Sequence, residues 1–482
     1  MEGLKQKTIR AGTARLAGQF CRSIVRFASI VILARLLEPS DFGVVAMVMV
    51  LTGVFEIFAT GGLSLATVQR HKISDAQLSY MFWFNLAIGV LLAALCVALA
   101  PALGAFYHEP EAAWVLIATA PAFVFTGAGV QHIAILVREM RHAMLSLIEV
   151  IGETIALIVG VAMALTGWGY WSLVGMALVM PLTITIGAWI ATGWVPGAAR
   201  HCSGVVSMLK FGGVLTLNNL IIYAGYNFEK LLLGRYFGAD VLGLYSRVYE
   251  LINLPTRIIN SAFGSVTFAA LSRVQKEPAR FRSYFVKSYS LVLSITIPVT
   301  IFCAVLADDV ILVVLGPKWV DGIIIFQLLA PTILVFGIIN PFAWLLQSAG
   351  LHMRSLHTAL VIAPLTICSY FIGIPYGPTG VAAAYSTAMV LWVLPHTYWC
   401  LYGTQVRIRD LIPAIIRPFA AGACAGIAAE LAHHFAATIP FPLVRLMVAG
   451  LAMLSVYAFV LLVVLKQWGF YFELLMGLKR TA

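Results

Sequence analysis

Charged side chains occur inside long apolar segments of this sequence, where ionic groups are costly. The first such segment contains Arg15, Arg22 and Arg26, and spacings of seven and four residues place all three on one face of a helix. Glu149 and Glu153 lie four residues apart beside another apolar segment and share a helix face in the same way. A charge at membrane depth costs about 3 kcal/mol or more and normally faces protein or a water-filled cavity. These residues are therefore candidates for a functional site.

A second set of polar residues lies in the middle of the chain. Spacings of three, three, four and three residues keep one stripe of a helix polar, comprising Arg247, Glu250, Asn253, Arg257 and Asn260. The segment before it adds amide, phenol and charged groups, namely Asn218, Asn219, Tyr223, Tyr226, Asn227, Glu229 and Lys230. Glu56 lies in the second apolar segment of the chain.

Arginines around a cavity suit an anionic ligand, because guanidinium groups bind phosphate oxygens in pairs. Asn and Tyr side chains offer hydrogen bonds to sugar hydroxyls. The predicted substrate-binding residues are Arg22, Arg26, Arg247, Arg257, Asn219, Tyr223, Asn227 and Asn253. The predicted coupling groups or charge partners are Glu56, Glu149, Glu153 and Glu250. An alternative stays open, in which Arg22 and Arg26 pair with Glu56 or Glu153 as internal struts.

The elements that hold these residues are helices in a membrane. The 482 residues are 61% hydrophobic and only 11% charged, whereas soluble chains average about 25% charged residues. The apolar residues form solid runs long enough to cross a bilayer as helices, and β-barrel strands would alternate instead. The sequence therefore predicts an all-α, polytopic integral membrane protein. Fourteen spans are expected, centred near residues 25, 54, 89, 124, 156, 179, 222, 253, 294, 334, 366, 390, 424 and 454.

The distribution of Lys and Arg predicts the orientation of these spans. If the N-terminus is cytoplasmic, the connections on that side hold twenty Lys and Arg residues and the opposite connections hold only Arg235 and Lys318. Cytoplasmic connections are enriched in Lys and Arg, so both termini are predicted to be cytoplasmic. The same bias explains the net charge of +11 without nucleic-acid binding.

An internal repeat predicts the domain organisation. Leu33 to Leu37 followed by Gly43 is similar to Leu233 to Phe237 followed by Gly243, and each stretch joins the first two spans of a set of six. Parallel repeats of six spans place a substrate site between the halves. We expect an N-terminal six-helix lobe at residues 1–195, a second at 196–405, and two extra helices with a cytoplasmic tail at 406–482. The polar leading hairpins would face each other across a central cavity.

The chain resembles a known transporter family at several points. Ile32 to Gly43, Gly61 to Arg70, Phe82 to Asn85 and Asn227 to Arg247 are similar to Wzx-type polysaccharide flippases of the exopolysaccharide branch. These belong to a superfamily (MOP) that also holds the MurJ flippases and the MATE antiporters. The resemblance implies flipping of undecaprenyl-diphosphate-linked oligosaccharide across the bacterial inner membrane by alternating access, with Arg22, Arg26 and Arg257 on the diphosphate. It also implies contacts with membrane lipids and with polymerase and export machinery.

Other function classes are less well matched. A MATE-like drug or ion antiporter would share the fold, but its cationic ligands fit an arginine-lined cavity poorly. A membrane polymerase or ligase would need a larger periplasmic loop with basic residues than these connections provide. The chain has no GxxxxGK[ST] phosphate loop, no paired cysteines with ligand spacing and no catalytic triad pattern, and His433 with His434 suits a helix end. We expect a monomeric non-enzyme without a metal or cofactor.

Overall fold

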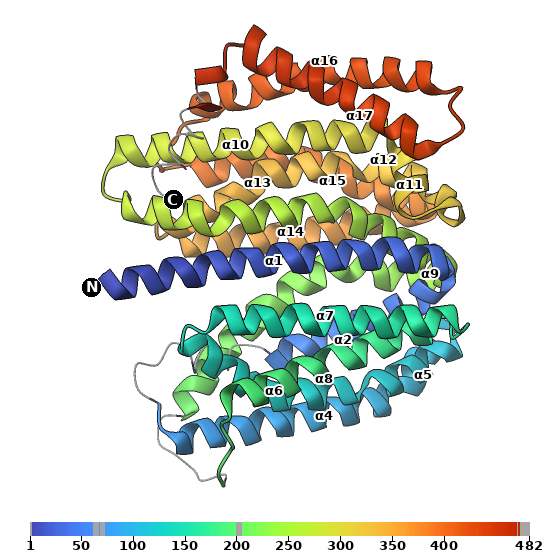
Figure 1. The fold of residues 1–482 in the computed structure, drawn as a ribbon, viewed down its shortest axis with the longest axis vertical. Helices are drawn as coiled ribbons and strands as arrows, with labels where there is room; N and C mark the ends of the chain where they lie inside the picture. The colour runs from blue at the N-terminus through green and yellow to red at the C-terminus, as the bar shows by residue number, and fades with distance from the viewer. Residues whose placement is uncertain (1, 61–66, 68–72, 199–204, 470, 473–482) are drawn as a thin grey trace. The chain divides into compact units, whose positions relative to one another are not determined.

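The computed structural model is built from helices, and the part of the chain that it describes contains no strand (Figure 1). It describes residues 2–60, 67, 73–198, 205–469 and 471–472. Within these ranges, the side chains of residues 2–16, 205–219, 221, 222, 224, 226, 265 and 352 are not described. The predicted residue Asn219 therefore has a backbone position but lies outside the described side chains.

The chain divides into two compact units, Met1–Ser246 and Arg247–Ala482. The division falls inside a long helical run and not at the predicted lobe boundary after residue 195. The six-helix lobes inferred from the repeat stay a prediction about duplication and movement.

Seven helices and the start of a long helical run make up the described part of the first unit. Their bounds are α1 (Glu2–Leu36), α2 (Pro39–Thr60), α4 (Asp75–Tyr107), α5 (Pro110–Thr119), α6 (Pro121–Arg138), α7 (His142–Leu165), α8 (Trp171–Thr192) and the start of α9 (Val205–Arg273). Local sequence sets several of these ends. Ser74 and Gln77 form a capping box at the start of α4, and proline occupies the first turn of α5 and of α6, where its missing N–H costs no hydrogen bond.

Small residues bring the helices of this unit close together. A Cβ on Gly89 of α4 would lie 2.5 Å from the carbonyl oxygen of Phe123, and one on Gly127 of α6 would lie 2.6 Å from that of Asn85. Helices in a membrane associate through such close backbone packing because lipid supplies no hydrophobic drive. The pairing of α4 with α6 therefore depends on two glycines that face each other's backbone.

The run α9 contains two helices. Gly238 has φ +80° and ψ −173°, which interrupts the helix and produces the turn between the predicted seventh and eighth spans. The second helix continues without a break through the boundary between the two compact units.

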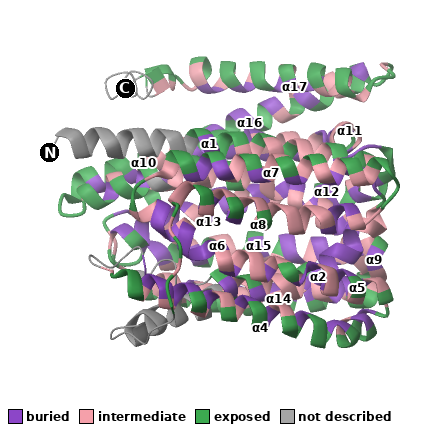
Figure 2. Ribbon diagram, turned by 60° about the horizontal axis from the view of Figure 1, so that its bottom comes forward, coloured by how far each residue is buried: buried purple, intermediate pink, exposed green. Residues whose placement is uncertain are grey.

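The second unit contains the end of α9 and the remaining elements. These are α10 (Pro278–Val305), α11 (Ala307–Val314), η1 (Pro317–Gly322), α12 (Ile323–Leu329), α13 (Pro331–Ser348), α14 (His352–Gly373), η2 (Ile374–Tyr376), α15 (Gly377–Leu401), α16 (Ile408–Ala436), α17 (Pro442–Phe459) and a π-turn η3 (Val460–Val464). Figure 2 shows exposed residues along much of α16 and α17, the two additional helices.

A proline in α10 creates an attachment point for α17. Pro298 has no N–H, so the carbonyl of Ser294 one turn earlier has no helical donor. The buried hydroxyl of Tyr457 on α17 donates to that carbonyl at 2.8 Å. The predicted appendix of two helices is thus tied to the second unit by a specific hydrogen bond.

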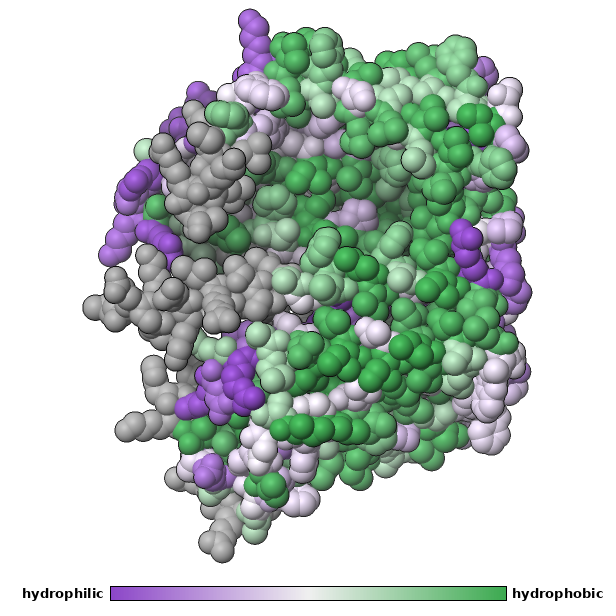
Figure 3. Space-filling view, viewed as in Figure 1, coloured by the Kyte–Doolittle hydropathy of each residue, from purple (hydrophilic) through white to green (hydrophobic). Residues whose placement is uncertain are grey.

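The predicted membrane class is confirmed. Eleven helical segments of the described residues are long and apolar enough to cross a bilayer, and each of the fourteen predicted span centres lies within a helix. On the face shown in Figure 3, hydrophobic side chains cover the length of the helices while hydrophilic ones gather towards the helix ends. The chain is a polytopic α-helical membrane protein.

Candidate functional site

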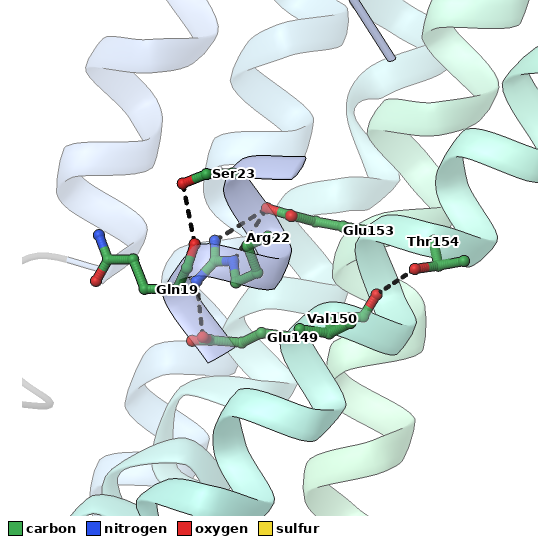
Figure 4. A network of polar contacts seen from close by, with 7 residues as sticks. All are labelled: Gln19, Arg22, Ser23, Glu149, Val150, Glu153 and Thr154. Carbon is green, nitrogen blue, oxygen red and sulfur yellow. Dashed lines mark hydrogen bonds and ion pairs between the residues drawn. The ribbon is translucent and has the colours of Figure 1, made fainter. Parts of the chain in front are cut away.

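Three of the predicted charged residues of the first unit meet in one network (Figure 4). Arg22 on α1 donates from Nη1 to Glu149 Oε2 at 2.7 Å, and from Nε and Nη2 to Glu153 Oε1 at 3.1 and 3.0 Å. The two glutamates are one turn apart on α7, so both carboxylates reach the same guanidinium. The structure therefore brings together residues that are more than 120 positions apart in the sequence.

A glycine on α1 sets the position of this network. A Cβ on Gly18 would lie 2.4 Å from the Cβ of Ser146, so α1 and α7 approach closely there. Arg22 follows Gly18 by one helical turn, and Glu149 and Glu153 follow Ser146 by one and two turns. The arginine therefore extends across the interface just beyond its closest point.

The charges of the network do not balance. One guanidinium faces two carboxylates, and the side chains of Arg22, Glu149 and Glu153 are 34%, 28% and 13% exposed. Glu153 Oε2 is buried and has no hydrogen-bond partner in the described part of the chain. The structure thus contains the Arg22–Glu153 pair of the alternative interpretation, and Glu149 joins it. In this conformation an anion would have to displace carboxylates from Arg22.

Two other predicted residues of this unit have exposed side chains. They are Arg26, one turn after Arg22 on α1, and Glu56 on α2. Arg26 is the residue of this pair of arginines that presents its side chain at the surface of the unit.

Three polar residues of the first half of α9 form hydrogen bonds with backbone or with each other. The hydroxyl of Tyr223 donates to the carbonyl of Met49 on α2 at 2.8 Å. Asn227 donates from Nδ2 to the carbonyl of Tyr223, and its Oδ1 accepts from Lys230 Nζ at 2.9 Å. Tyr223 is therefore a helix-packing contact here, and Asn227 positions a lysine.

In the second unit, one carboxylate lies between two arginines. Glu250 Oε2 accepts from Arg247 Nη1 at 2.6 Å, and Glu250 Oε1 lies 3.9 Å from Arg257 Nη2. Asn253 donates to the carbonyl of Tyr249, one turn before it. The stripe therefore has one more positive than negative charge, and its most exposed charged side chain is Arg257, at 45%. The net charge of this stripe is therefore opposite in sign to that of the Arg22 network, which has one more carboxylate than guanidinium.

A small cavity with a mainly apolar lining adjoins this stripe. Its volume is about 10 Å³, and it lies between α9, α10 and α13, with Thr256, Asn260 and Thr296 among the lining residues. A space of this size holds about one water molecule. It is too small for a sugar, so the second unit does not use it to hold an oligosaccharide.

Sequence reasoning missed a buried ionic cluster at α11. Asp309 is fully buried and accepts from Arg445 Nε and Nη2 at 3.0 and 2.6 Å, while His433 Nε2 lies 3.0 Å from its other oxygen. The residues come from α11, α17 and α16 in that order. The sequence did show Arg445 inside the last apolar span and Asp309 at the end of another apolar span. Nothing in the sequence pairs the two.

These features define a class of protein: a multi-pass helical membrane protein with ionic networks inside its membrane-crossing helices. A sequence model described as "Polysaccharide biosynthesis protein" matches residues 32–324, which is more than half of the chain. The chain belongs to this family, as the resemblance predicted.

Curated relatives agree with the family assignment. The chain is 26% identical over 323 residues to "Lipopolysaccharide biosynthesis protein WzxC" of Escherichia coli K12, covering 66% of this chain and 65% of WzxC, just under two thirds of that protein. It is 24% identical over 456 residues to "Succinoglycan biosynthesis transport protein ExoT" of Rhizobium meliloti, covering 92% of this chain and 90% of ExoT.

The fold is similar to that of a solved flippase. The structure titled "Lipid II flippase MurJ, inward closed conformation" superposes with a TM-score of 0.75 at 16% identity, covering 92% of this chain and 97% of that one. The predicted MOP-type fold is confirmed by this likeness.

Proposed function

We propose that this protein is a flippase that moves undecaprenyl-diphosphate-linked oligosaccharide repeat units across the bacterial inner membrane by alternating access. The polymer produced from these units would be an exopolysaccharide, a capsule or a lipopolysaccharide. The observation that carries this proposal is the family match over residues 32–324, in a chain whose fold is that of a lipid-linked sugar flippase.

The relatives support the kind of substrate. WzxC is named for lipopolysaccharide biosynthesis and ExoT for succinoglycan transport, while the MurJ title names lipid II, a lipid-linked sugar. All three names concern polysaccharide or its lipid-linked precursor. A lipid-linked oligosaccharide is therefore the substrate class that fits this chain.

The arginines supply the chemistry that a diphosphate requires. Arg26 and Arg257 have exposed side chains in their own units, and guanidinium groups bind phosphate oxygens in pairs. Arg22 is held by Glu149 and Glu153, so its participation requires exchange of a carboxylate for a phosphate. We assign Arg26 and Arg257 to direct diphosphate contact and Arg22 to a contact made after this exchange.

The orientation belongs to the same proposal. The Lys and Arg bias supports cytoplasmic N- and C-termini, which would place the turns at residues 37–39 and 237–240 on the periplasmic side. A reporter fused after Ala482 should be active only if it is one that works in the cytoplasm. Activity of a periplasmic reporter there would contradict the even number of spans.

The test is deletion of the gene in its host, followed by analysis of surface polysaccharide and of undecaprenyl-linked intermediates. We expect loss of one polymer with its lipid-linked repeat unit accumulating on the cytoplasmic side, and recovery when the gene is restored. Unchanged polysaccharide with altered sensitivity to cationic compounds would contradict the flippase and favour an antiporter. Accumulation of repeat units on the periplasmic side would instead indicate a polymerase or ligase.

A further inference from the structure

The two copies of the internal repeat touch each other at equivalent glycines. A Cβ built on Gly43, at the start of α2, would lie 1.8 Å from the carbonyl oxygen of Ala239. A Cβ built on Gly243 would lie 1.8 Å from the carbonyl oxygen of Pro39. All four residues belong to the first compact unit. Only glycine fits at either position, because any side chain would overlap backbone that cannot move aside.

The contact is reciprocal under the repeat. Adding 200 to Gly43 gives Gly243, and adding 200 to Pro39 gives position 239, so each copy contacts the other through the same two positions. Such an exchange of contacts is the property of an isologous interface, in which one two-fold axis relates the two partners. The axis of the duplication therefore passes between these glycines.

This contact consists of backbone against backbone. Glycines at both centres allow the chains to approach without interlocking side chains, as in other small-residue contacts of membrane helices. On the first turn, the amide of Glu38 donates to Asp41 Oδ2, and the amide of Asp41 donates to the carbonyl of Glu38. Both of these hydrogen bonds lie within the turn, so they can persist if the turn moves. Such a turn can separate from its neighbour as a rigid piece.

Like charges lie beside the second turn. Glu109, which precedes α5, lies close enough to Glu111 and Asp240 for their charges to act on it. Burial is the first cause of the raised pKa of Glu109, and the two neighbouring carboxylates add to it. When all three groups are ionised, their repulsion opposes the approach of the second turn to the end of α4. Close packing thus holds the second turn against the first turn, and charge opposes its approach to the end of α4.

We propose that the Gly43–Gly243 contact is a reversible seal, which closes one end of the transport path and separates once in each cycle. This inference rests on the proposed function, because it assumes that a substrate must leave at the end of the membrane where these turns lie. The two glycines are positioning residues: they allow closure and contact no substrate.

Cross-linking tests whether the seal must open. Ser40 and Asp240 are equivalent under the repeat, each lies next to a contacting residue, and neither is buried. In a variant without the seven native cysteines, Ser40→Cys with Asp240→Cys would be treated with a short cleavable bis-maleimide, followed by pulse-labelling of new surface polysaccharide. The matched control pair is Glu38→Cys with Ser40→Cys, which links residues of one turn only.

We expect the inter-turn cross-link to abolish export, cleavage to restore it and the control cross-link to leave it unchanged. Normal export by the cross-linked protein would overturn the seal, as would failure of the pair to cross-link at all. Export by the untreated double-cysteine variant tests the flippase function separately, so loss of the seal hypothesis and loss of the proposed function are distinguishable.

Substitution of the glycines gives a second test. Gly43→Ala and Gly243→Ala should each reduce export at least tenfold at normal protein levels, because the added Cβ prevents closure. Gly469→Ala is the matched control, since a Cβ there meets nothing within 4 Å. If both substituted proteins accumulate normally and export at the control rate, the close contact is dispensable and the proposal is wrong. If either fails to accumulate, the cross-linking result alone decides.

Discussion

Replacement of Arg22 separates its structural role from its proposed contact with the diphosphate. Arg22 holds two carboxylates, Glu149 at 2.7 Å and Glu153 at 3.0 Å. Arg22→Gln leaves both carboxylates without their cation at membrane depth. Replacing all three residues by glutamine removes every charge of the network and keeps similar side-chain volumes.

The structure sets the size of the expected effect. Exposed ion pairs contribute about 0–1 kcal/mol, whereas removing one partner of a fully buried pair costs about 3–5 kcal/mol. With side chains 13% to 34% exposed, this network lies between these limits. We expect Arg22→Gln to lower the free energy of unfolding by about 2–3 kcal/mol, and the triple variant to regain most of that loss.

The assay combines thermal unfolding of the purified protein in detergent with restoration of surface polysaccharide in the deletion strain. We expect the triple variant to be about as stable as the original protein but deficient in export, because a diphosphate contact has been lost. Wild-type export by the triple variant would show that Arg22 is only a strut. Wild-type stability of the Arg22→Gln variant would refute the assignment of the network as a structural tie.

Three further predictions concern other groups. Asp309→Asn should lower the free energy of unfolding by about 3 kcal/mol and increase proteolysis of the last two helices, because the substitution leaves a largely buried arginine without its carboxylate. Tyr457→Phe should lower the free energy of unfolding by about 1 kcal/mol, because the Ser294 carbonyl, which has no helical donor above Pro298, also loses the Tyr457 hydroxyl. Tyr376→Phe, at an exposed tyrosine, is the control and should leave the free energy of unfolding unchanged. The raised pKa of Glu109 favours its protonated form in the folded state, so the stability it contributes is present at acidic pH and lost as pH rises through that pKa. Glu109→Gln should flatten this part of the pH profile of thermal unfolding. An unchanged pH profile would contradict the prediction.

The membrane fold could be predicted from composition because span length and hydropathy depend on local sequence alone. Each predicted span centre lies in a helix, and the break at Gly238 falls in the connection expected between the seventh and eighth spans. The physical reason is that a segment in hydrocarbon must form all its backbone hydrogen bonds within itself, so a long apolar run folds as a helix.

The pairing of charges could be predicted only in part. The spacing of Glu149 and Glu153 places them on one face, but the rotation of α7 relative to α1 decides which arginine they meet. That rotation depends on the contact of Gly18 with Ser146, which hydropathy does not encode. The pair of Asp309 and Arg445, 136 residues apart, shows the same limit.

Within the second unit, Pro255 lies between the two arginines that flank Glu250. It has no N–H, so the carbonyl of Leu251 one turn earlier has no helical donor, and the helix can bend at this point. If Arg247 and Arg257 bind the diphosphate as predicted, a bend at Pro255 would change their spacing about Glu250 and so weaken their joint hold on the phosphate oxygens.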